Sequence, residues 1–112
     1  MSQPAEVPQA FVRVCAVDEV PEPGALRVEI GGVPISIVRS EGEVYAIHDV
    51  CSHAEVSLSE GEIYDTTIEC WLHGSCFDLR TGNPTGLPAT KPVPVYQTRI
   101  DGGDVYVRPE ES

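Results

Sequence analysis

The chain has 112 residues, of which 41% are hydrophobic, so its length predicts one folded domain with a modest core. Eighteen acidic residues against seven basic ones give a formal net charge of −11. This balance argues against nucleic acid and against an anionic membrane surface as partners, because both are bound through Lys and Arg. It favours a partner that carries a basic docking surface.

Short strand-like segments follow one another along most of the chain, after a polar, Pro-bearing tail at residues 1–9. The segment ALRVEI (25–30) alternates, with apolar side chains on one face and Arg27 and Glu29 on the other, as in a half-buried strand. The tripeptide DGG (101–103) predicts the turn of a hairpin. The remaining segments of strand composition are 11–17, 33–40, 43–50, 95–100 and 104–108.

These segments predict an all-β fold, an antiparallel sandwich or small barrel, as one domain over residues 10–110. Residues 50–93 have a different composition, because they are rich in Gly, Pro, Ser and Thr and their strand signals are short. Long irregular segments inside compact domains are usually functional. We therefore expect residues 50–93 to form a loop-rich subdomain inserted between the strands of the β scaffold.

The compartment follows from the apolar runs and the cysteines. No apolar run approaches the roughly 20 residues of a transmembrane helix, and the sequence starts without the regions of a signal peptide. We therefore expect a cytoplasmic protein with no membrane association, in which Cys/His clusters more often bind metal than form disulfides. Of the four cysteines, only Cys51 and Cys70 have a histidine at ligand spacing.

The candidate metal site consists of two thiol–imidazole pairs, Cys51 with His53 and Cys70 with His73. Thiolates and neutral imidazoles are both good ligands for iron and zinc. Each pair offers one ligand of each type, which suits a binuclear centre whose two metals have different ligands. A structural zinc site and a Cys–His nucleophile are the alternatives, although the nucleophile would lack an orienting third residue.

The segments CSHAEVSLSEG (51–61) and CWLHGSCFDLRTG (70–82) resemble the motifs of the Rieske family, and most closely its ferredoxin branch. The resemblance implies a Rieske-type β fold with a cluster-binding subdomain and one 2Fe-2S cluster. By the same resemblance, Cys51 and Cys70 would hold one iron. The other iron would be bound by His53 and His73 through ring nitrogens.

Three more residues are expected beside the cluster, Gly74 from its position directly after His73 and the other two from this resemblance. Gly74 would let backbone N–H groups approach the cluster sulfides. Ser75 would donate a hydrogen bond to a cluster sulfur. Pro88 lies near the centre of a Pro-bearing segment that resembles the loop covering the cluster, where it would exclude water.

The resemblance also implies where the reduction potential lies. High-potential respiratory members join their two cluster loops by a disulfide, but the matching positions here are Val56 and Leu72. Phe77 stands where those members place a Tyr whose hydroxyl donates to a sulfur. Without this donor the reduced state is less favoured, so we expect a potential toward the low end of the family range of about −150 to +300 mV.

The function implied is that of an electron-transfer protein, without catalytic residues of its own. It would be a ferredoxin that passes one electron from an NAD(P)H-dependent flavoprotein reductase to the terminal oxygenase of a dioxygenase system. A housekeeping electron donor to another iron-dependent pathway is one alternative, and a zinc-stapled interaction module without redox function is another. The sequence names no final substrate or oligomeric state, and it assigns no role to Cys15, Cys76 or His48.

Overall fold

The computed structural model describes residues 11–51, 56–71, 74–85 and 91–111. One antiparallel sheet of these residues contains β1 (Val12–Ala16), β2 (Gly24–Ile30), β3 (Val33–Ser40), β4 (Glu43–His48), β8 (Val95–Asp101) and β9 (Asp104–Glu111). A small second sheet contains β5 (Ile63–Tyr64), β6 (Thr67–Glu69) and β7 (Cys76–Asp78). Two single-turn 3-10 helices span Val17–Glu19 and Leu58–Glu60. The described part of the chain contains no helix with the length and apolarity that a membrane crossing requires.

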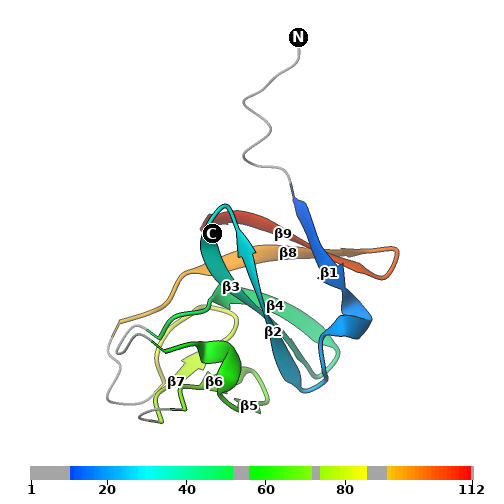
Figure 1. Cartoon of the computed structure of the whole chain (residues 1–112). Coiled ribbons are helices and arrows are strands. Elements are labelled where there is room, and N and C mark those ends of the chain that lie inside the picture. The colour runs from blue at the N-terminus through cyan, green and yellow to red at the C-terminus, as the bar shows by residue number, and fades with distance from the viewer. Residues whose placement is uncertain (1–10, 52–55, 72–73, 86–90, 112) are drawn as a thin grey trace.

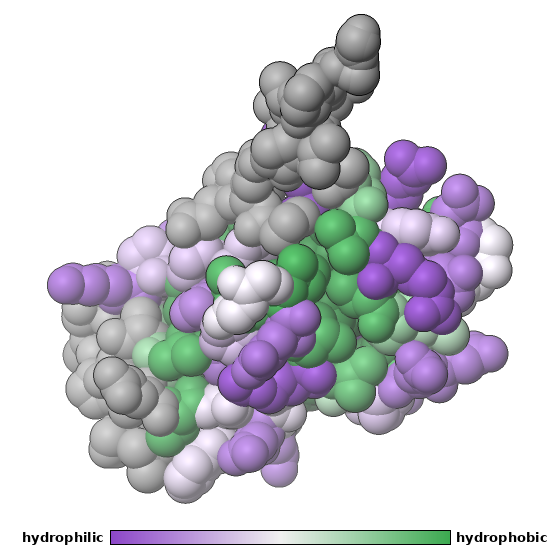
Figure 2. Space-filling view, turned by 45° about the horizontal axis from the view of Figure 1, so that its top comes forward, coloured by the Kyte–Doolittle hydropathy of each residue, from purple (hydrophilic) through white to green (hydrophobic). Residues whose placement is uncertain are grey.

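The large sheet has the strand order β1-β9-β8-β4-β3-β2 and curls into a barrel that is not fully closed (Figure 1). Among the described residues, the edge strands β1 and β2 are not paired with each other. Leu26, Val28 and Ile30 of β2, on the face predicted to be apolar, are therefore only partly buried. Figure 2 shows apolar side chains gathered near the middle of the face that it presents.

The prediction of an all-β antiparallel fold with a small barrel is confirmed. The tripeptide at 101–103 does form a hairpin turn, because Asp101 pairs with Asp104 across it. The inserted region contains short strands as well as loops, since β5, β6 and β7 all lie within it. These strands are two or three residues long, too short for the alternation of side chains to be recognised in the sequence.

Strand β3 is buried on both faces, and this divides the core into two clusters. Ile35 and Ile37 point into the barrel, where they pack with Val105 and Val107 of β9. The next side chain along the strand, Val38, points the other way because successive residues alternate between faces. It belongs to a second buried cluster between the barrel and the small sheet, which also includes Ile47, Leu58, Ile68, Phe77 and Leu79.

The small sheet is joined to the end of β3 by a buried hydroxyl. Ser40, only 3% exposed, donates from its Oγ to the backbone oxygen of Asp65 at 2.6 Å. Asp65 forms the turn between β5 and β6 and has a positive φ of 54°. The barrel therefore fixes which face of the small sheet packs against it and where the β5–β6 turn lies. Cys70 directly follows β6 of this sheet.

We expect Ile37→Ala to lower the free energy of unfolding by about 2–5 kcal/mol, because Ile37 is fully buried in the barrel and its loss leaves a cavity. Ile100 is the matched control, since it is in β8 of the same sheet but 49% exposed. Ile100→Ala should change the stability by no more than about 0.5 kcal/mol. Denaturant unfolding followed by circular dichroism measures both, and equal losses would contradict the assigned core.

Candidate metal centre

Cys51 lies at the base of the first predicted cluster loop, and its side chain is 3% exposed. Its backbone N–H donates to the oxygen of Val56 at 3.0 Å, where the loop returns. Farther from the tip of the loop, the N–H of Leu58 donates to the oxygen of Asp49, also at 3.0 Å. These two bonds join the outgoing and returning legs of the loop, so the position of Cys51 is set by backbone contacts on either side of it.

Asp49, two residues before Cys51, carries a carboxylate with no solvent exposure. Its Oδ1 accepts a hydrogen bond from the N–H of Ser59 at 2.7 Å, and its Oδ2 accepts one from the Ser59 hydroxyl at 3.1 Å. A buried charge needs such donors because it has lost its water. Asp49 was not predicted to be a site residue, although an isolated acid at the end of a strand is a usable signal.

Cys70 directly follows β6 and is fully buried. Its N–H donates to the oxygen of Ser75 at 2.6 Å, and its own oxygen accepts from the N–H of Gly74 at 2.9 Å. Gly74 has a φ of 77°, in the left-handed region that side chains disfavour, so a glycine suits this tight return. Ser75 is itself fully buried at the point where the chain enters β7.

The two cluster loops approach each other backbone to backbone at Gly61. A Cβ atom added to Gly61 would lie 1.6 Å from the backbone oxygen of Glu69, the residue before Cys70. Any side chain at position 61 would therefore push the first loop away from the second. This contact, which the sequence did not predict, explains the glycine that ends the motif CSHAEVSLSEG.

The two described thiols fit the sulfur half of the predicted centre. Cys51 and Cys70 arrive on separate loops but belong to the same buried cluster, with Leu58, Ile68 and Phe77 around them. Two thiols in one water-poor core suit the pair of thiolate ligands of a single iron. The predicted ligands His53 and His73, together with Pro88, lie outside the described residues. Within the described residues, no group of three His, Cys, Asp or Glu side chains is placed to hold a metal ion.

The remaining cysteines and histidine lie elsewhere. Cys15 of β1 is buried in the barrel core opposite Val105, and this burial raises the pKa of its thiol. His48 ends β4, and its backbone N–H donates to the oxygen of Pro94. Cys76 of β7 lies opposite Glu69 and is partly exposed. Trp71, next to Cys70, has 52% of its surface exposed.

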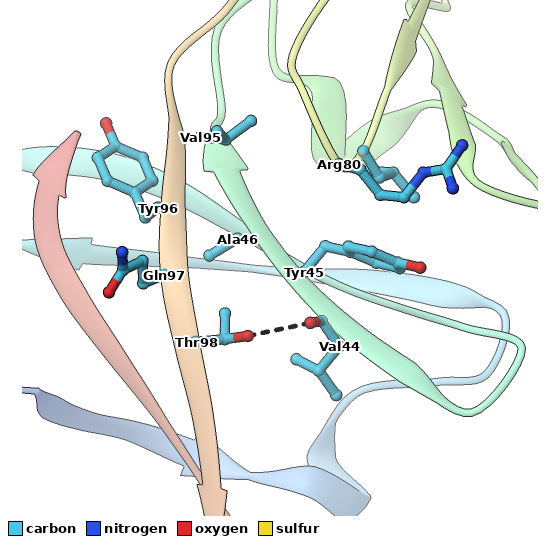
Figure 3. A pocket seen from close by; sticks show the side chains of 9 residues that line it. Val44, Tyr45, Ala46, Arg80, Val95, Tyr96, Gln97 and Thr98 are labelled. Carbon is cyan, nitrogen blue, oxygen red and sulfur yellow. Dashed lines mark hydrogen bonds between the residues drawn. The ribbon is translucent and has the colours of Figure 1, made fainter. Parts of the chain in front are cut away.

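A hollow of about 450 Å³ lies between β4 and β8 (Figure 3). The strands pair at Ala46 with Tyr96, and beyond this pair the Thr98 hydroxyl reaches across to the Val44 oxygen at 3.1 Å. The hollow is lined by Val44, Tyr45, Ala46, Leu79, Arg80, Val95, Tyr96, Gln97 and Thr98. None of these described lining residues is a cysteine or histidine, although Leu79 also packs in the buried cluster that contains Cys51 and Cys70.

Comparisons with known proteins agree with this geometry. A model of the Rieske [2Fe-2S] domain matches residues 10–97. The 3-phenylpropionate/cinnamic acid dioxygenase ferredoxin subunit of Escherichia coli (strain K12) is 43% identical over 97 residues, which cover 86% of this chain and 91% of the relative.

Two solved structures are similar over nearly the whole fold. The ferredoxin of carbazole 1,9a-dioxygenase from Nocardioides aromaticivorans IC177 has a TM-score of 0.86 and 38% identity, covering 90% of this chain and 99% of the other. A chain from the complex of reduced oxygenase and oxidized ferredoxin in carbazole 1,9a-dioxygenase also has a TM-score of 0.86. It is 35% identical and covers 93% of this chain and 97% of that chain.

We expect Glu69→Gln to make the Cys76 thiol more reactive. Burial, and then the negative charge of Glu69, raises the pKa of Cys76, and the thiolate is the reactive form. Removing the charge lowers this pKa, so a larger fraction of the thiol is ionised at pH 8. Iodoacetamide labelling of the Cys76 peptide, followed by mass spectrometry, should show a faster reaction. Glu43→Gln, in β4 of the barrel, is the control, and an equal rise there would contradict the assignment.

Proposed function

Because the chain belongs to the Rieske [2Fe-2S] family, we propose that Cys51 and Cys70 hold one iron of its cluster and that His53 and His73 hold the other. The family prediction is confirmed, and with it the cofactor, a single Rieske-type 2Fe-2S cluster. One observation supports the assignment most directly. Cys51 and Cys70, on separate loops, are both buried in one apolar cluster, at the bases of loops that touch at Gly61.

The chain acts as an electron carrier, and its relatives are named as ferredoxin subunits of dioxygenases. When bound, the cluster accepts and releases one electron. The chain supplies the surroundings: the apolar cluster excludes water from the two thiolates, and the backbone bonds at Cys51 and Cys70 fix both loops. A rigid, dry site limits the rearrangement that accompanies each transfer. The predicted low reduction potential stays a prediction. Phe77, on which it depends, is fully buried in β7.

We propose an NAD(P)H-dependent flavoprotein reductase as the electron donor and a terminal oxygenase as the acceptor. The acceptor is supported by the relative named as a dioxygenase ferredoxin subunit and by the solved complex of an oxygenase with a ferredoxin. The donor follows from the family resemblance of the sequence. Membership of the Rieske family argues against the zinc-stapled module, whereas a housekeeping donor would use the same cluster and differ only in its acceptor.

Three further expectations stay predictions. They are a cytoplasmic location, a tail at residues 1–9 that lies outside the described residues, and a single domain over residues 10–110 with its cluster-binding part at 50–93. Gly74, Ser75 and Pro88 are likewise proposed to surround the cluster. The N–H of Gly74 donates to Cys70 within the second loop, so its described role is to shape that loop.

Substitution of each ligand should abolish the Rieske spectrum. We expect Cys51→Ser, Cys70→Ser, His53→Ala and His73→Ala to lose the EPR signal that dithionite produces, because each removes a ligand of iron. The matched controls are Cys15→Ser, Cys76→Ser and His48→Gln, which replace the chain's other cysteines and histidine. They should keep the signal.

Metal and sulfide analysis of the same samples distinguishes a Rieske cluster from a zinc site. Two irons and two sulfides in each wild-type chain, with a reduced signal of low average g value, support the Rieske cluster. A colourless wild-type protein with one zinc per chain would overturn it. Loss of the signal in Cys76→Ser but not in Cys70→Ser would reassign the sulfur ligands.

The partner proposal is tested by reconstitution. We expect the purified protein to restore NADH-driven dihydroxylation of 3-phenylpropionate when it replaces the ferredoxin in the Escherichia coli dioxygenase system. Oxygenase and reductase are held constant, product is measured by chromatography, and Cys70→Ser is the control without a cluster.

This reconstitution tests the identity of the acceptor separately from the electron-carrier function. If the cluster is reduced by the reductase but yields no product with this oxygenase or with the carbazole 1,9a-dioxygenase oxygenase, the terminal oxygenase is the wrong acceptor. A housekeeping pathway is then the better assignment. Product formation that requires the intact cluster supports the oxygenase.

A further inference from the structure

Arg27 projects from the edge strand β2 onto the first cluster loop. It lies on the outward face that the alternation in residues 25–30 predicts, and its side chain is 42% exposed. Its Nη1 donates to Oδ2 of Asp49 at 2.8 Å and to Oγ of Ser57 at 3.2 Å. Its Nη2 points outward, where it donates to Glu29 at 3.2 Å.

The two inner contacts of Arg27 are on opposite legs of the loop that begins at Cys51. Asp49 is on the outgoing leg, and Ser57 is on the returning leg beside Val56, whose oxygen binds the N–H of Cys51. An isolated antiparallel bridge between Val50 and Ser57 joins the same two legs. One guanidinium nitrogen therefore spans the loop immediately below the proposed iron ligand.

The contact with Asp49 also has an electrostatic consequence. The Asp49 carboxylate is fully buried, and within the described part of the chain Arg27 is the only cation that forms an ion pair with it. Removing one member of such a pair leaves the other charge uncompensated in a poorly solvated site. The guanidinium is charged at any working pH, and the hydrogen bond to Asp49 is the main cause that raises the pKa of Arg27 further.

We propose that Arg27 is a positioning residue of the cluster site, which acts through Asp49 and Ser57 rather than by touching the metal. It holds the legs of the first loop together, and its charge offsets that of Asp49 close to Cys51. Arg27 thereby slows loss of the cluster and raises its reduction potential. This inference depends on the proposed cluster at Cys51, His53, Cys70 and His73.

The two charges predict shifts of the potential in opposite directions. Arg27→Met removes a cation and leaves the Asp49 carboxylate, which disfavours an added electron, so the potential falls. Asp49→Asn removes the anion and leaves the Arg27 cation, so the potential rises. The double variant removes both charges and should lie between the two. Simple damage to the fold would destabilise both single variants without giving the shifts opposite signs.

The experiment measures three properties of purified holoprotein. Redox titration gives the potential, and bleaching of the visible spectrum in a chelator gives the rate of cluster loss. Hydrogen exchange gives the protection of the backbone amides of Cys51 and Leu58. In Arg27→Met we expect a lower potential, cluster loss faster by about 10–100-fold, and weaker protection at both amides, because residues that orient metal ligands affect retention on this scale.

Two more variants keep the test decisive. Arg27→Lys retains the charge but loses the planar fork, in which Nη2 is held by Glu29 while Nη1 makes both loop contacts, so its potential should stay near wild type while cluster loss is faster. Arg13→Met is the matched control, because Arg13 is an exposed arginine of the other edge strand, paired with Asp104. It should leave all three properties unchanged.

The proposal is overturned if Arg27→Met and Asp49→Asn shift the potential in the same direction, or if neither shifts it more than Arg13→Met does. If Arg27→Met does not load a cluster, the comparison of Arg27→Lys and Asp49→Asn with wild type decides. Equal potentials in these three proteins would then reject it. A wild-type protein without any iron–sulfur spectrum would instead mean that the proposed function itself is wrong.

Discussion

A carboxylate that is removed from water must be surrounded by donors, and at Asp49 this requirement organises the first cluster loop. The donors come from Ser59 on the returning leg and from Arg27 on the barrel edge. The carboxylate can be satisfied only when both the loop and the barrel are in place. Burial of this one charge therefore gives Cys51 a defined position in a segment whose sequence predicts no regular structure.

The second loop depends on a different kind of contact. Cys70 follows β6, whose Ile68 packs in the cluster shared with Val38 of β3, so the small sheet is fixed by apolar burial against the outer face of the barrel. The hydroxyl of Ser40 sets the position of the β5–β6 turn. Hydrogen bonds to a buried carboxylate position the first loop, and apolar packing positions the second. Because Gly61 has no side chain, the two loops can come into contact there.

Much of this arrangement was predictable from local sequence patterns. Alternation in residues 25–30 and the turn at 101–103 correctly indicated strands of the barrel, because these signals depend on neighbours in the chain. The spacing of Cys51 and Cys70 from their histidines indicated a metal site for the same reason. The contact of Arg27 with Asp49 joins positions 22 residues apart, so no local pattern revealed it.

Other features were out of reach for physical reasons that concern size and surroundings. Strands of two or three residues, such as β5, show no periodicity. A glycine that is needed because a distant carbonyl approaches it, as at Gly61, looks in sequence like any turn glycine. The mixed strand-and-loop character of the inserted region therefore emerged only from the structure, where its own Ile68 and Phe77 pack with Val38 and Ile47 of the barrel.

The pairing of β1 with β9 joins the two ends of the described chain, and the ion pair between Arg13 and Asp104 connects residues 91 positions apart. Contacts of such long sequence separation form late in folding, since a large loop must close before they are made. During synthesis β9 leaves the ribosome after β2, β3 and β4, whose hairpins can already pair. The sheet is thus completed only when β9 pairs with both β1 and β8.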